Sequence, residues 1–461
     1  MASSVLDHHD VRASVDLLAA WIEGQMAYRG WPGLSIAIVH EQDVLWSRGF
    51  GWADAGTRTP ATAETLYRVA SITKTFTATA LLQMRDAGKL RLDDALRDHL
   101  PWFTPPTPYA DAPPITLRHI LTHTTGLARE APFPYWTALH FPAIEEIRAA
   151  VASQASVLAT EDRWKYSNLA FVMAGEVVAQ VSGMPWAMYV RSRILDPLGM
   201  RASLVDNPAA DQPGLARGYS RRLPSGERGP VGPYDLRGVS AAAALTTSVA
   251  DLARFAMLQF RDGPAGGAQV LRGSTLREMQ RVHWIEPDWQ AGWGLGFHIY
   301  RAHDRTLVGH GGSLRGYRSD IRFSPTERVA VIVLINADDG EARLVVDKAF
   351  EWVAPAIARA TAPPPPVPDP AWQRYVGRYR NTWGDAQVLV IGGRLSIIGP
   401  NLPDPMWAPS TLVPIGEHTF RLETRDGYGS HGERAVFELD ASGTVKRLTI
   451  GYEEILPVSE W

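Results

Sequence analysis

A proline-rich segment at Thr361–Pro370 separates two stretches of sequence with different character. Six of its ten residues are prolines, which lack the backbone N–H that helices and central strands need and which hold the chain extended. We therefore expect a first domain at residues 1–360, a stiff linker at residues 361–370 and a second domain at residues 371–461.

The first stretch mixes strand-like and helix-like runs. Leu34–His40 and Val44–Phe50 predict a β-hairpin, and Tyr317–Phe323 and Val329–Ile335 predict a later pair of strands. Helices are expected where apolar runs follow a capping residue or precede a stop signal: Thr75–Met84, Leu169–Val181 with Asn168 as its cap, Val249–Phe260 with Ser248 as its cap, and Leu344–Ala360. Residues 101–114 and 205–238 are rich in turn residues and are expected to be irregular.

The second stretch contains short runs of alternating polarity separated by turn residues. This pattern predicts a small all-β barrel or sandwich. The runs are Ala386–Ile391, Arg394–Ile398, Thr419–Glu423, Ala435–Leu439 and Val445–Tyr452.

Composition narrows the classes of function. The absence of cysteine excludes disulfides, thiolate metal sites and cysteine nucleophiles, and the net charge of −3 argues against nucleic acid or anionic membrane as a partner. The longest apolar run, Val329–Ile335, is too short to span a bilayer, and the first residues do not resemble a signal peptide, so a cytoplasmic location is expected. His8-His9-Asp10 is not interpreted as a metal site because a mobile terminus is expected there. No metal or organic cofactor is expected.

The tetrapeptide Ser71-Ile72-Thr73-Lys74 is the first candidate for catalysis. On a helix its serine and lysine lie one turn apart on the same face, so the amine could accept the hydroxyl proton. A helix N-terminus would leave the Ser71 backbone N–H free for an oxyanion, and its positive end would lower the pKa of Lys74. The alternative is an ordinary serine cap followed by a surface lysine.

Two further groups of residues could complete such a site. Tyr166-Ser167-Asn168 offers a phenol and an amide just before a predicted helix. His310-Gly311-Gly312-Ser313 precedes a predicted strand, and its glycines would let a substrate approach the backbone closely.

In this order the three motifs resemble those of the penicillin-binding protein and class C β-lactamase family of serine hydrolases. The segments Thr65–Ser71, Ile120–Leu127 and Ala244–Leu252 also resemble the family, and the resemblance covers about residues 15–360. It implies an α+β fold in which helices flank an antiparallel sheet, with a mostly helical subdomain and the site between the two.

The resemblance also implies roles for the matched residues. Ser71 would be the acylated nucleophile, and Lys74 and Tyr166 would share proton transfer, with the choice of base left open. The other roles are Asn168 against the acyl group, His310 and Gly312 at the far wall, and the backbone N–H groups of Ser71 and Ser313 as the oxyanion hole.

Two departures from the family pattern bear on function. His310-Gly-Gly stands where the β-lactamases usually have Lys-Thr-Gly, so a fixed cation is replaced by a mostly neutral side chain. Ala241–Ala244 stands where relatives often have a glycine pair, which leaves the local turn uncertain. We expect a carboxylesterase or D-amino-acid-type peptidase that acts on a small ester, amide or peptide. A β-lactamase or DD-carboxypeptidase, a non-catalytic ligand-binding protein and a homo-oligomer remain open.

Mainly structural roles are expected for other aromatic and histidine residues. Tyr375–Tyr379 and Phe437–Gly443 resemble the lipocalin-like β-domain appended to some of these hydrolases. His123 is expected to be a hydrogen-bonded loop histidine. Packing is expected for Trp284, Trp289 and Trp293, and for at least two members of a cluster that could also line an acyl pocket: Phe133, Tyr135, Trp136 and Phe141.

Overall fold

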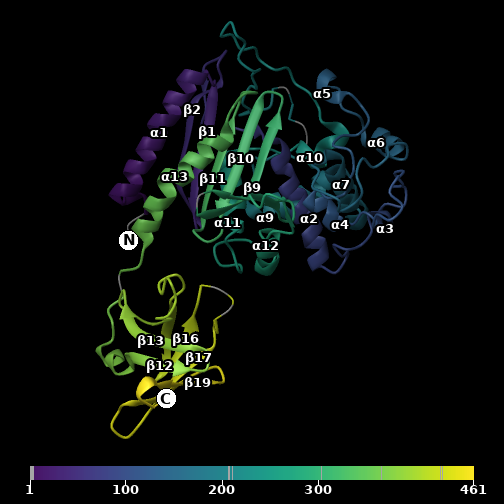
Figure 1. Ribbon diagram of the computed structural model, residues 1–461. Helices are drawn as coiled ribbons and strands as arrows, with labels where there is room; N and C mark the ends of the chain where they lie inside the picture. The colour runs from purple at the N-terminus through teal and green to yellow at the C-terminus, as the bar shows by residue number, and fades with distance from the viewer. Residues whose placement is uncertain are drawn as a thin grey trace. The chain divides into compact units, whose positions relative to one another are not determined.

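The computed structural model describes residues 5–460 except residues 206, 207, 210, 303, 365, 426 and 428. The excluded positions include Pro365 of the proline-rich segment, three residues of the 205–238 stretch for which irregular structure is expected, and the first four residues of the chain. The chain forms two compact units, Met1–Ala360 and Thr361–Trp461 (Figure 1). None of the helices in the described part has the length and apolar character needed to cross a bilayer.

The first unit is built on an antiparallel sheet of nine described strands, in the order β3-β2-β1-β11-β10-β9-β8-β7-β6. β1 lies between β2 and β11, so the early hairpin pairs directly with the last strand of the unit. The strands of this sheet are β1 (Gly33–His40), β2 (Asp43–Asp54), β3 (Thr59–Pro60), β6 (Trp284–Ile285), β7 (Ala291–Trp293), β8 (His298–Ala302), β9 (Arg305–Leu314), β10 (Tyr317–Ser324) and β11 (Val329–Ile335). The expected α+β class, hairpin and later strand pair are confirmed.

Helices cover both faces of this sheet (Figure 1). The side chains of β11 alternate, with Val331 and Val333 in the core under two of the helices and Ile332 and Leu334 in the core on the other face. Each such fully buried side chain contributes roughly 1.5–3 kcal/mol to folding. The two helices on the first face are α1 (His9–Arg29) and α13 (Ala342–Thr361).

α1 corrects the expectation of a mobile N-terminus. The side chain of His8 accepts a hydrogen bond from the backbone N–H of Asp10 and caps the helix. Val11, Val15 and Leu18 are among the buried residues of the helix, at the three- and four-residue spacing of an amphipathic helix.

The other face of the sheet carries the helical part of the unit. Its elements are α2 (Thr73–Asp86), α3 (Leu96–His99), α4 (Leu117–Thr122), α5 (Tyr135–Ala138), α6 (Ile144–Val151), α7 (Asn168–Ser182), α8 (Trp186–Val190), α9 (Asp196–Leu198), α10 (Ser240–Ala243), α11 (Val249–Leu258) and α12 (Gly273–Met279), with the small pair β4 (Tyr67–Arg68) and β5 (Thr246–Thr247). The expected helices are present with boundaries that differ by at most two residues, and residues 101–114 are irregular as expected.

α2 is a central helix in which threonines alternate with other side chains. Thr75, Thr77 and Thr79 are buried, and their hydroxyls donate to backbone carbonyls, which satisfies polar groups that would otherwise be costly in the core. α7 packs closely against the alanine run of α10. Gly175 permits this approach, since a Cβ there would lie 2.3 Å from the Cβ of Ala241.

The second unit is a closed barrel of eight described strands, in chain order around the barrel. Its core includes Tyr375 and Phe437, whose rings stack with centroids 4.4 Å apart. The strands are β12 (Gly377–Asn381), β13 (Gly384–Ile391), β14 (Arg394–Ile398), β15 (Ser410–Gly416), β16 (Thr419–Glu423), β17 (Arg434–Leu439), β18 (Val445–Ile450) and β19 (Glu453–Pro457). Of the expected barrel or sandwich, the barrel is confirmed.

Candidate active site

Ser71 lies in a tight turn that leads into α2. The 3-10 turn covers Ala70–Ile72, and Ala70 has a φ of 52°. This left-handed conformation costs a residue with a side chain roughly 1–2 kcal/mol. The hydroxyl of Ser319 on β10 donates to the carbonyl of Val69 at 2.9 Å, which ties the turn to the sheet.

Lys74 is completely buried one helical turn after Ser71. Its Nζ donates to Ser71 Oγ at 3.1 Å, to Asn168 Oδ1 at 2.7 Å and to the Ala242 carbonyl at 2.9 Å. Burial lowers the Lys74 pKa to about 7, because removing the ammonium from water disfavours the charged form. The predicted lowering of the Lys74 pKa is confirmed, but its predicted cause, the positive end of the helix, is not the main one. Burial is the main cause.

Tyr166 is a second partner of the Ser71 hydroxyl. Burial raises the Tyr166 pKa, and its hydrogen bond with Ser71 opposes that rise. The Lys74 Nζ lies 5.0 Å from the centroid of the Tyr166 ring. The amine of Lys74 and the phenol of Tyr166 therefore both contact the Ser71 hydroxyl.

Asn168 links this group to a carboxylate that the sequence analysis did not single out. Its Oδ1 accepts from Lys74, and its Nδ2 donates to Glu130 Oε1 at 2.6 Å. Tyr135 donates to the other oxygen, Glu130 Oε2, at 2.6 Å. The sequence predicted Asn168 as the cap of α7, and this is wrong. Ser167 caps the helix by accepting from the backbone N–H of Ala170, which leaves the Asn168 amide free for these contacts.

His123 lies behind Tyr166 and is part of the same packed group. Its ring stacks on that of Tyr166 with centroids 4.2 Å apart, and Nδ1 accepts from the backbone N–H of Ser167 at 3.2 Å. Nε2 is buried without a hydrogen-bond partner in the described structure. Burial and the nearby Lys74 hold the His123 pKa well below its usual value, so the ring is neutral. The prediction of a hydrogen-bonded loop histidine is correct for only one of its two nitrogens.

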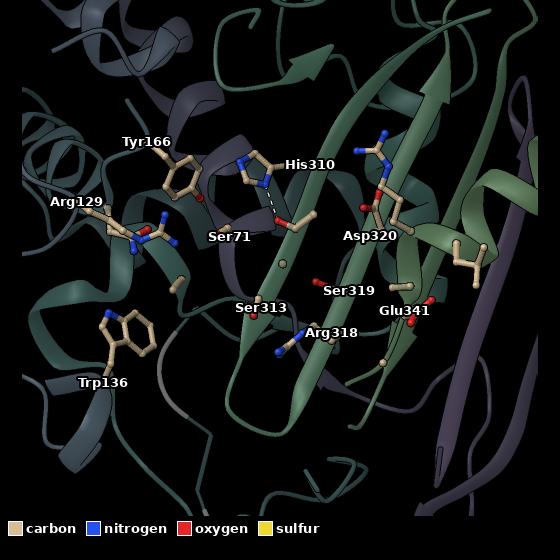
Figure 2. Close-up of a pocket in the computed structure, with 18 of the residues that line it drawn as sticks. Ser71, Arg129, Trp136, Tyr166, His310, Ser313, Arg318, Ser319, Asp320 and Glu341 are labelled. Carbon is tan, nitrogen blue, oxygen red and sulfur yellow. Dashed lines mark hydrogen bonds between the residues drawn. The ribbon is translucent and has the colours of Figure 1, made fainter. Parts of the chain in front are cut away.

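The β9 strand supplies the opposite wall (Figure 2). His310 Nδ1 lies 2.6 Å from the Gly311 carbonyl and donates to it, while the buried Nε2 has no hydrogen-bond partner among the described residues. Burial holds the His310 pKa well below its usual value, with a smaller effect of Lys74. Gly312 allows the strand to approach the Ser71 turn, because a Cβ there would lie 2.1 Å from the Val69 carbonyl oxygen.

Several of these side chains border a cavity of about 880 Å³. Among the residues that line it are Ser71, Tyr166, Asn168, His310, Gly312 and Ser313 from the sequence prediction, and Arg129, Glu130, Trp136, Arg318 and Glu341 in addition. Lys74 is not among the lining residues, but its Nζ contacts two of them, Ser71 and Asn168. The structure thus brings the sequence-predicted residues together around one cavity.

The aromatic residues divide as follows. Trp136 lines the cavity, while Tyr135 and Phe141 are buried in the core, so the prediction that at least two of this cluster serve packing is confirmed. Trp293 is also buried, but Trp289 is 74% exposed, and the packing prediction for it is wrong because it lies in the turn between β6 and β7.

Comparison with known proteins gives consistent matches over the first unit. The family model described as Beta-lactamase matches residues 18–355. Penicillin-binding protein 4 of Amycolatopsis lactamdurans is 28% identical over 314 residues, which cover 66% of this chain and 81% of the relative. The D-aminopeptidase of Gluconobacter oxydans (strain 621H) is 26% identical over 314 residues, again 66% of this chain but only 56% of the relative. The chain therefore spans little more than half the length of that second relative.

One solved structure is similar over almost the whole chain. The octameric penicillin-binding protein homologue from Pyrococcus abyssi has a TM-score of 0.64 and 24% sequence identity, with 96% of this chain and 99% of that chain covered. At this identity the similarity supports the fold, including the terminal barrel, and nothing about activity.

Proposed function

The chain belongs to the beta-lactamase family of serine hydrolases, and from this premise we propose that it cleaves small esters or amides through an acyl-enzyme on Ser71. The observation that carries the proposal is the contact between Ser71 Oγ and the Nζ of Lys74, a buried amine with a pKa of about 7. Near neutral pH a large fraction of this amine is unprotonated and can accept the hydroxyl proton.

The proposed reaction has two halves. Ser71 Oγ loses its proton to Lys74 and bonds to the substrate carbonyl carbon, and the oxyanion would be held by the backbone N–H groups of Ser71 and Ser313. The bond to the leaving group then breaks while Tyr166 donates a proton to the departing oxygen or nitrogen and recovers one from Lys74. Water then attacks the acyl-enzyme with the same proton transfers. It loses a proton to Lys74, Ser71 leaves with a proton from Tyr166, and the acid is released. The raised pKa of Tyr166 supports its role as the donor rather than the first base.

Within this chemistry we favour a carboxylesterase or a D-amino-acid-type peptidase. His310 is neutral and buried, so β9 does not supply the fixed cation found in enzymes that destroy β-lactams. The match to a D-aminopeptidase supports the peptidase reading. A β-lactamase or DD-carboxypeptidase remains the second candidate because the similarity to penicillin-binding protein 4 covers most of that relative.

The test is a panel of p-nitrophenyl esters, D- and L-aminoacyl anilides and a chromogenic cephalosporin, with wild type and Ser71→Ala compared on each. We expect Ser71-dependent turnover of at least one ester or D-aminoacyl anilide and a covalent acyl adduct by mass spectrometry. Equal rates in the two proteins would contradict the mechanism. A lack of both turnover and adduct would instead favour a non-catalytic ligand-binding protein on the same fold.

We further propose a division into a hydrolase domain at residues 1–360, a linker at 361–370 and a lipocalin-like domain at 371–461. The closed barrel supports this proposal. Expression of residues 1–360 alone tests it, and a cooperatively unfolding fragment is expected.

We also propose that the protein forms a homo-oligomer, because the Pyrococcus abyssi homologue is octameric. A measurement of molar mass in solution tests this proposal.

A further inference from the structure

His123 contacts the segment that carries Tyr166 at three points. Its backbone carbonyl accepts from the N–H of Lys165 at 2.8 Å, and its Nδ1 accepts from the N–H of Ser167 at 3.2 Å. These two residues stand directly before and after Tyr166. The imidazole also stacks on the Tyr166 ring, with centroids 4.2 Å apart. One residue therefore holds both the ring of Tyr166 and the backbone on each side of it.

His123 is itself fixed by its surroundings. It follows α4 directly and caps that helix in the left-handed conformation, with a φ of 58°. The residue is 0% exposed, and its ring contacts Phe171 of α7 and Trp293 of β7, with centroids 5.1 Å and 4.9 Å away. A ring packed by several elements keeps one position, because a close-packed interior leaves little room for another rotamer.

The loop that follows His123 holds the next part of the same segment. The carbonyl of Arg129 accepts from the N–H of Asn168 at 2.8 Å. Arg129 also approaches the Tyr166 ring, with its guanidinium carbon 5.0 Å from the ring centroid, but this side chain is 63% exposed. Of the two side chains, the buried His123 supplies the fixed contact with the phenol.

The action of His123 on the reaction is indirect. It is not one of the described residues that line the cavity, so it does not meet the substrate there. Burial and the nearby Lys74 hold the His123 pKa well below its usual value, which leaves the ring neutral. A neutral ring places no positive charge beside Tyr166 that would favour loss of the phenol proton.

We propose that His123 is a positioning residue for Tyr166, which it holds where the phenol can protonate the leaving group. This inference rests on the proposed function, in which Tyr166 donates that proton. Its consequence is a dependence on the leaving group. An alkoxide needs the donated proton to depart, whereas p-nitrophenolate leaves without it near neutral pH. A misplaced phenol therefore slows alkyl esters and spares p-nitrophenyl esters.

The experiment compares the benzyl and p-nitrophenyl esters of an acyl group that wild type turns over, in wild type, His123→Asn and His123→Gly. Both replacements tolerate the left-handed backbone. Asparagine keeps an amide oxygen near the place of Nδ1, whereas glycine also leaves the Ser167 N–H without this acceptor. We expect kcat/KM, which reports acylation, to fall about tenfold or more on the benzyl ester and less than about threefold on the p-nitrophenyl ester. The larger loss is expected in His123→Gly.

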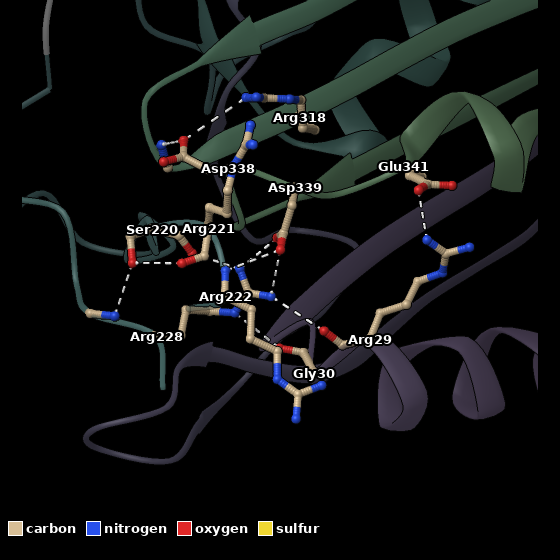
Figure 3. A network of polar contacts seen from close by, with 12 residues as sticks. Arg29, Gly30, Ser220, Arg221, Arg222, Arg228, Arg318, Asp338, Asp339 and Glu341 are labelled. Atoms are coloured by element: carbon tan, nitrogen blue, oxygen red, sulfur yellow. Dashed lines mark hydrogen bonds and ion pairs between the residues drawn. The ribbon is translucent and has the colours of Figure 1, made fainter. Parts of the chain in front are cut away.

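The control for a merely structural defect is Asp339→Asn. Asp339 lies outside the cavity lining and accepts from Arg228 Nη2 and from the Arg222 N–H, each at 3.1 Å. Arg228 also donates to the carbonyls of Arg29 and Gly30, so this network ties the end of α1 to the rest of the unit (Figure 3). Its loss should change both esters by the same factor.

Two outcomes overturn the proposal. The first is an equal loss on the two esters in both His123 variants while circular dichroism shows folded protein, because a general structural defect slows all acylation alike. The second is a selective loss in Asp339→Asn as large as that in the His123 variants. The selective loss would then be a general response to disturbed packing.

The proposed function and the positioning role can fail separately. Equal rates in wild type and Ser71→Ala, or equal losses on the two esters in Tyr166→Phe, would contradict the function. The positioning role is then judged by hydrogen exchange of residues 164–168 in Ser71→Ala, with and without His123→Gly. Faster exchange in this segment supports the role, and unchanged exchange overturns it.

Discussion

Lys74 Nζ lies closer to Asn168 Oδ1, at 2.7 Å, than to Ser71 Oγ, at 3.1 Å. The amine is thus held by an amide and a backbone carbonyl while its remaining contact is with the nucleophile. A buried lysine with this set of acceptors is positioned whether or not it carries a proton. The site therefore couples the protonation of Lys74 to both activity and stability.

The first prediction concerns the pH dependence of stability in Lys74→Met. Folding lowers the Lys74 pKa from 10.5 to about 7, so between these values the unfolded chain binds more protons than the folded one. Lys74 consequently lowers stability by up to a few kcal/mol below pH 7, and the loss disappears as the pH rises toward 10.5. Lys74→Met should abolish activity yet raise Tm at pH 6.5, with the difference from wild type shrinking by pH 9.5. A lower Tm for the variant at both pH values would contradict this account.

The second prediction assigns a positioning role to Glu130. Its charge raises the Lys74 pKa against the effect of burial, and its oxygen fixes the Asn168 amide. Glu130→Gln should therefore move the acidic limb of the kcat/KM profile to lower pH, because the amine deprotonates more readily.

The control for Glu130 is Glu341→Gln, which also removes a carboxylate from the cavity wall but one that is paired with Arg29. Its acidic limb should stay in place. A purely structural role for Glu130 would lower the rate at all pH values without moving the limb, and that outcome would refute the prediction.

Comparison of sequence and structure shows which contacts a linear pattern can reveal. The contact between Ser71 and Lys74 follows from helical periodicity alone, and the order of the motifs singled out Tyr166 and His310, which line the same cavity. Glu130 was missed because its contact with Asn168 joins residues 38 positions apart through a loop that carries no periodic signal. Arg318 was missed because its place opposite Ser313 depends on strand register, which the sequence analysis did not assign.

The helix α1 is a different case, because a usable signal was present. Buried residues recur at three- and four-residue spacing from Val11 to Met26 and predict an amphipathic helix.

The cause of the lowered Lys74 pKa was also misjudged from sequence. Helix position is local and visible in the sequence, whereas burial depends on how α2, α7 and α10 pack together.

A third prediction follows from the backbone of His123, which has a φ of 58°. Asparagine tolerates this left-handed conformation, whereas a β-branched residue is strained there by roughly 1–2 kcal/mol. His123→Asn should therefore be more stable than His123→Val by about that amount, measured by urea unfolding. Both variants lose the ring stacked on Tyr166, so we expect kcat to fall about tenfold in each. Equal stability of the two variants would show that the backbone conformation is not retained.

The last prediction concerns the close approach of β9 to the nucleophile turn. A Cβ at Gly312 would lie 2.1 Å from the Val69 carbonyl oxygen and 2.2 Å from Ser319 Oγ, and these two atoms are themselves hydrogen-bonded. Gly312→Ala must therefore displace the turn that carries Ser71, and a shift of about 1 Å there is expected to reduce kcat/KM by about 100-fold or more.

Gly311→Ala is the matched control for Gly312→Ala because the one tight contact of its new Cβ would be with the side-chain oxygen of Asp320, at 3.0 Å, and the nearest backbone atom, the Ser319 carbonyl oxygen, would lie at an ordinary 3.7 Å. It adds the same methyl group to the same strand one residue away, where a side chain rather than backbone has to yield. We expect a loss of less than about tenfold, measured on the same ester with circular dichroism to confirm folding. Similar losses in both variants would mean that β9 responds to an added methyl group in the same way at both positions. The contact with Val69 would then not set the position of Ser71.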